Sequence, residues 1–146
     1  MPASTAALPD TVRHDLIAAA TLLRDRGIWR AETSFAAPDG YPDLWDPLAW
    51  AGAGPAAALD PMAALWLAAH PGDLPAAFTA ATPEAAADAC DLLLDDPRTG
   101  PAVQALADSL DPDLITDPIE RIAYWVDGAT DNEVIGRLLR LADTLT

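Results

Sequence analysis

The chain has 146 residues, 51% of them hydrophobic, with a single cysteine and a formal net charge of −15. This length and apolar content predict one domain with its own core, and a lone cysteine excludes a secreted scaffold held by internal disulfides. All eight basic residues are arginines, outnumbered by 23 acids, which argues against direct binding to nucleic acid or to anionic membranes.

The first predicted element is a helix over residues 11–26, where apolar residues recur at helical spacing and Gly27 supplies a stop signal. Residues 1–10 would form an N-terminal arm before it. Residues 28–35 are rich in aromatic and branched side chains, which predicts a short strand or hairpin, or an extended lead-in. A loop rich in Pro, Gly and Asp follows over residues 36–46.

Asp-Pro pairs mark further helix starts, because Asp caps free amide groups and Pro fits the first helical turn. The pairs are Asp46-Pro47, Asp60-Pro61, Asp96-Pro97, Asp111-Pro112 and Asp117-Pro118. After a short helix that begins at the first pair, we expect helices over residues 62–70, 83–95, 101–110 and 118–128, and a last one from the capping box Thr130–Glu133 to about residue 145. The sequence therefore predicts a single all-α domain, residues 1–146, built as a compact orthogonal bundle of six to seven short helices.

Both ends of the chain carry a family resemblance. Leu22-Leu23 followed by Gly27 and Trp29, and a Trp–x–Asp turn that leads into a final helix, resemble an uncharacterised family of small actinobacterial and actinophage proteins, domain of unknown function family 6197. Residues 122–135 match best, although Val126 stands where the family usually has Asn. The resemblance implies a compact helical fold and a bacterial or phage setting, and it assigns no catalytic residues.

The sharpest chemical pattern is a row of four acids with the spacing i, i+4, i+7, i+11: Glu84, Asp88, Asp91 and Asp95. This spacing places four carboxylates in one stripe of a helix. A solvated outer face is the simpler interpretation, since amphipathic helices turn their charges outward. The functional interpretation is a docking stripe for the basic surface of a partner protein, which in its strongest version imitates the phosphates of DNA.

Three aromatic residues gather around a Pro-rich loop: Tyr41, Trp45 and Trp50. Aromatic side chains in a loop anchor interfaces or line small-molecule pockets. The alternative is that they add bulk to the core of an alanine-rich bundle, as we expect for Trp29, Trp66 and Trp125. Both interpretations of the aromatic loop stay open.

The sequence predicts no catalytic, cofactor-binding or metal-ligating residue. Cys90 lies on the apolar side of its helix, and neither His14 nor His70 belongs to a metal-binding motif. We therefore expect a non-enzymatic regulatory or inhibitory protein that needs no cofactor and binds a partner with a basic surface. A small-molecule binder that uses the aromatic loop and an enzyme with a carboxylate-based site are the alternatives. Without a signal peptide or an apolar run of membrane length, we expect a cytoplasmic location.

Overall fold

A computed structural model describes residues 3–28, 59–73, 75–78, 83–110 and 116–145. They form α1 (Ala3–Arg26), α2 (Pro61–Ala69), the 3-10 helix η2 (Ala76–Phe78), α3 (Pro83–Asp95), α4 (Thr99–Asp108), α5 (Pro118–Gly128) and α6 (Asp131–Thr144). The predicted all-α compact bundle is confirmed. Within the described ranges, no helix is both long enough and apolar enough to cross a membrane.

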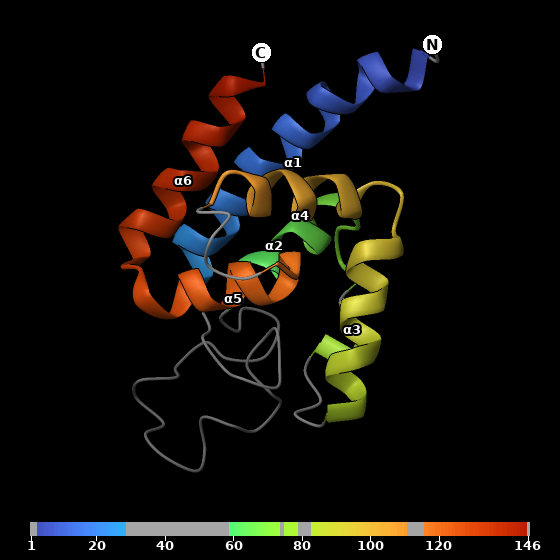
Figure 1. Ribbon diagram of the computed structural model, residues 1–146. Coiled ribbons are helices and arrows are strands. Elements are labelled where there is room, and N and C mark those ends of the chain that lie inside the picture. The colour runs from blue at the N-terminus through green and yellow to red at the C-terminus, as the bar shows by residue number, and fades with distance from the viewer. Residues whose placement is uncertain (1–2, 29–58, 74, 79–82, 111–115, 146) are drawn as a thin grey trace.

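The bundle is built around α1, which packs against α6 on one side and α2 on the other. Helix α4 crosses in front of them and contacts α1, α2, α3 and α5 (Figure 1). Helix α3 stands at the edge of the bundle, where it packs against α4 and η2. The largest fully buried side chains include Leu16, Leu65, Phe78, Leu106 and Leu138. Helices α1, α2, η2, α4 and α6 therefore all contribute to one core.

Helix α1 begins at Ala3, which corrects the predicted start at residue 11. Residues 3–10 therefore belong to the helix. Pro9 led to the wrong prediction, because proline removes a backbone donor and costs about 3 kcal/mol inside a helix. Ala3, Ala6 and Ala7 precede it in the helix, and alanine has the highest helix propensity.

The chain leaves α1 through Gly27, whose φ of 89° is in the left-handed region that favours glycine. Ile28 then forms an isolated parallel bridge with Leu59, and the Leu59 amide donates to the Gly27 carbonyl at 3.1 Å. The rest of the predicted strand or hairpin, residues 29–35, lies outside the described residues, as does the helix expected after Asp46-Pro47.

Three predicted helix caps are confirmed. The Asp60 carboxylate accepts a hydrogen bond from the Met62 amide at 2.8 Å, and the Asp117 carboxylate accepts one from the Glu120 amide at 3.0 Å. The capping box at the start of α6 has both of its hydrogen bonds. These starts were predictable because each cap depends on residues no more than three apart.

Two arginines from separate helices bind the end of α4. Arg121 of α5 donates to the Ala107 carbonyl and Arg137 of α6 donates to the Ser109 carbonyl, each at 3.1 Å. Cations are favourable there because the last carbonyls of a helix lack partners and carry partial negative charge. The Arg137 guanidinium also lies 5.9 Å from the ring centroid of Trp125, a half-buried side chain packed against the core.

Gly100 marks a close approach between α4 and the end of α3. A Cβ atom on this residue would lie 2.6 Å from the Leu94 carbonyl oxygen, a backbone atom. We predict that Gly100→Ala lowers the free energy of unfolding by about 2 kcal/mol, because the two helices must shift apart. Urea unfolding measures this. The control is Gly128→Ala, where nothing lies within 4 Å of the added Cβ; equal losses in the two variants would contradict the prediction.

Candidate functional site

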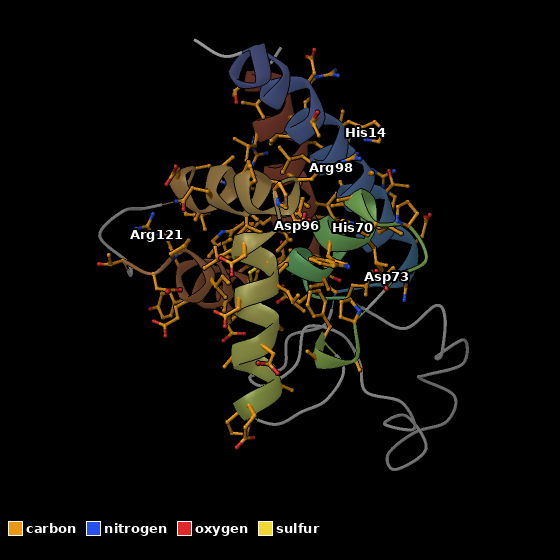
Figure 2. The ribbon with its side chains drawn as sticks, turned by 90° about the vertical axis from the view of Figure 1, so that its right-hand side faces the viewer. His14, His70, Asp73, Asp96, Arg98 and Arg121 are labelled. Atoms are coloured by element: carbon orange, nitrogen blue, oxygen red, sulfur yellow. The ribbon has the colours of Figure 1, made fainter. Side chains whose placement is uncertain are left out.

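A groove of about 660 Å³ opens beside α3. Among the described residues, its apolar lining consists of Trp66, Ala77, Leu92 and Pro97. Its acidic lining comes from four more: Asp88, Asp91, Asp95 and Asp96. The groove is thus built by α2, η2, α3 and the turn between α3 and α4, and Figure 2 shows α3 in front with His70 and Asp96 beside its end. We call the four apolar lining residues the floor of the groove and the three lining acids of α3, Asp88, Asp91 and Asp95, its acidic rim.

The predicted stripe of four acids lies on the exposed side of α3: Glu84, Asp88, Asp91 and Asp95. The buried residues of the same helix, Ala89 and Leu93, lie on the opposite side. Three of the four acids line the groove, whereas Glu84, in the first turn, does not. Among the described residues, no arginine or histidine forms an ion pair with any of the four.

The described arginines lie outside α3, so no arginine within α3 offsets the negative charge of its acids. Helix α1 carries three acids and three arginines, and α6 carries three acids and two arginines. Helix α3 carries four acids and no arginine. Acids are exposed on several helices, but of the described helices α3 has the largest excess of negative charge, and that excess borders the groove.

The floor of the groove is held in place by Trp66. Its indole Nε1 donates to the Asp73 carbonyl at 2.8 Å. The centroid of the Trp66 ring lies 4.4 Å from the centroid of the His70 ring. The Trp66 ring also packs edge-on against Phe78, with the two centroids 5.5 Å apart. Such aromatic pairs stabilise a fixed geometry. Trp66 is only 6% exposed, so the prediction of a core residue is confirmed, and one edge of the same residue also reaches the groove.

Asp96, at the end of the groove, has several partners of its own. One carboxylate oxygen lies 3.0 Å from His70 Nε2, and the other accepts from the amides of Thr99 at 2.8 Å and Arg98 at 3.2 Å. Burial by itself would raise the pKa of Asp96, but hydrogen bonds from the Thr99 amide and from His70 lower it. Asp96 thus binds two amides just ahead of and at the start of α4, whose N-cap residue is Arg98, and it stays ionised at neutral pH.

The turn between α3 and α4 is anchored to α1 by an ion pair. The Arg98 guanidinium donates from Nε and Nη2 to the two carboxylate oxygens of Asp15, at 2.9 and 2.8 Å. The Asp15 side chain is fully buried, and its hydrogen bond is the main cause that raises the pKa of Arg98. His14 lies 3.3 Å from the same carboxylate and is itself 71% exposed. Figure 2 shows Arg98 between His14 and Asp96, so this pair positions the end of the groove.

Among the described residues, the Cys90 thiol is a further group of potential reactivity. Burial raises the pKa of the Cys90 thiol, and the negative charges of Asp117, Asp91 and Glu120 raise it further. A thiol of this kind is protonated at neutral pH and is a poor nucleophile. In the part of the chain that the structure describes, no group of three His, Cys, Asp or Glu side chains is arranged to hold a metal ion.

Sequence reasoning found the acidic rim and missed the floor. Trp66, Ala77 and Pro97 belong to three separate segments, and no local pattern brings them together. Leu92 was the only local sign of an apolar lining, because it is an apolar residue next to the acidic stripe on the helix surface. The Leu92 side chain is 38% exposed. The predicted aromatic loop residues, Tyr41, Trp45 and Trp50, lie outside the described residues, so their contribution stays a prediction.

Comparison of the chain with protein-family models, with curated proteins and with solved structures found no match. The resemblance to domain of unknown function family 6197 therefore stays a prediction.

Proposed function

We propose that this chain is a non-enzymatic docking module, regulatory or inhibitory in effect, that binds the basic surface of a partner protein in the groove beside α3. One observation carries the proposal. Asp88, Asp91 and Asp95 are exposed, have no cation beside them among the described residues, and border an apolar floor. A solvated outer face explains the acids but not their position around a groove.

The two parts of the groove have different physical roles. Carboxylates around a cleft attract cations at a distance and exclude anionic partners. The apolar floor supplies affinity that does not depend on salt, because burial of apolar surface is favourable at any ionic strength. A partner that uses both parts needs arginine or lysine beside apolar residues. This combination favours a protein segment over a purely electrostatic imitation of DNA, which would gain nothing from Leu92 or Pro97.

The test is removal of the rim charges, Asp88→Asn/Asp91→Asn/Asp95→Asn. The probe is a fluorescent peptide of about 14 residues composed of arginine, leucine and alanine, long enough to reach the whole groove. Each exposed ion pair contributes about 0.2–1 kcal/mol, so we predict that the triple variant binds about tenfold more weakly. Fluorescence anisotropy titrations at low and at physiological salt measure this.

The control has the same net charge with the groove intact. Asp25→Asn/Asp108→Asn/Asp127→Asn removes three exposed acids from the last turns of α1, α4 and α5. Both triple variants change the net charge from −15 to −12, so long-range attraction is matched. We expect the control to bind as the parent chain does. Equal losses of affinity in the two variants would show that net charge alone attracts the probe, and the proposed function would be wrong.

A further inference from the structure

We infer that the segment bound in this groove is a basic amphipathic α-helix of the partner, lying alongside α3. This inference rests on the proposed function and specifies the kind of partner. It depends on the spacing of the rim acids, on the position of Leu92 beside them, and on how little of α3 the bundle covers.

The spacing of the rim acids matches a helix. Asp88, Asp91 and Asp95 lie on consecutive turns of α3, and at 1.5 Å per residue they span about 10.5 Å along its axis. A partner helix aligned with α3 presents arginines at i, i+3 and i+7 over that same length, as in near-parallel helix packing. An extended strand presents side chains on one face at every second residue, so three of them span about 13.5 Å. The spacing of arginines on the helix therefore matches the spacing of all three carboxylates. The spacing of side chains on one face of a strand is longer than that of the carboxylates.

The apolar contacts lead to the same conclusion. Leu92 is four residues after Asp88 and three before Asp95, so it is their neighbour on the helix surface. A partner must therefore place an apolar stripe directly beside a basic stripe. Helical spacing produces two adjacent stripes on one side of a segment, whereas a strand that alternates basic and apolar residues sends them to opposite faces.

The outer surface of α3 is available for such contact. Only Ala89 and Leu93 of this helix are buried, and its packing partners are α4 and η2. Leu92 and Leu94 are 38% and 39% exposed, and they lie on opposite sides of the acidic stripe because residues two apart on a helix do not share a face. Of the two, Leu92 lines the groove, where an amphipathic partner helix can lay its apolar face as in helix-in-groove recognition.

The test compares two peptides of about 14 residues and identical composition, near the shortest length at which a helix is marginally stable alone. One places arginines at i, i+4, i+7 and i+11 with leucines on the adjoining stripe and alanines elsewhere, and the other alternates the same arginines and leucines in one continuous run flanked by the same alanines. We expect the first to bind the parent chain at least tenfold more tightly and to gain helical circular dichroism on binding. Leu92→Ser should weaken its binding about fivefold, whereas Leu94→Ser, equally exposed but not part of the groove lining, should not.

The possible results separate the inference from the proposed function. If both peptides bind equally well and both lose affinity with the rim variant, the helical preference is wrong while the docking function stands. Equal effects of Leu92→Ser and Leu94→Ser would also overturn the inference, because the apolar stripe would then have no defined position. If neither peptide distinguishes the parent chain from the rim variant, the proposed function and the inference fail together.

Discussion

We expect Arg98→Ala to lower the free energy of unfolding by about 3 kcal/mol, because it leaves the buried carboxylate of Asp15 without its guanidinium. Removing one partner of a buried ion pair is costly because the remaining charge can neither return to water nor find another cation. His14 Nδ1 lies 3.3 Å from an Asp15 carboxylate oxygen, but the His14 side chain is 71% exposed. It cannot replace the two hydrogen bonds that Arg98 donates to Asp15. Partial exposure of Arg98, at 42%, keeps the loss below that of a fully buried pair.

Chemical unfolding of four variants tests this explanation. Arg98→Lys keeps the charge but cannot form the forked contact, so we expect an intermediate loss. Arg24→Ala removes an exposed arginine from α1 and should cost less than about 1 kcal/mol. Replacing both partners, Asp15→Leu with Arg98→Ala, should recover most of the loss, since no buried charge is left. If the double variant is no more stable than Arg98→Ala alone, the loss has a cause other than the unpaired carboxylate.

The comparison of Asp15 with Asp60 shows what the sequence can predict. Asp60 was correctly predicted as a cap because its partner, the Met62 amide, is two residues away. Asp15 lies within the helix predicted over residues 11–26 and no local pattern marks it, because its partner Arg98 is 83 residues away. Local rules predict caps, stops and the stripe on α3, since these depend on neighbouring residues. A pairing between distant helices depends on how the whole bundle packs, and no local pattern encodes it.

The groove also has one part that local patterns predict and one part that depends on contacts between distant residues. The rim is one helix face, so its spacing could be read directly from Asp88, Asp91 and Asp95. The floor requires Trp66 from α2 to lie beside Pro97 from the turn after α3, and this proximity is a consequence of folding. The predicted start of α1 at residue 11 was wrong for a different reason. Proline usually breaks a helix, but α1 continues through Pro9 and begins at Ala3.

Trp66→Ala is expected to cost about 3–5 kcal/mol of stability, the range found for large aromatic residues removed from a core. The side chain is 6% exposed, packs against Phe78 and His70, and donates to the Asp73 carbonyl. Removing it therefore leaves a cavity and also deprives a carbonyl of its donor. A loss of this size is a large part of the 5–15 kcal/mol that stabilises most domains, so the transition should move to clearly lower urea concentrations.

Trp66→Phe separates the two causes. It keeps an aromatic ring in the core but has no group to donate to the Asp73 carbonyl, so we expect a loss of about 1–2 kcal/mol. If this substitution costs as much as Trp66→Ala, the hydrogen bond and not the packing dominates. If Trp66→Ala itself costs less than about 1 kcal/mol, Trp66 does not hold α2 against η2. The apolar floor of the groove would then lack the fixed geometry that a bound helix requires.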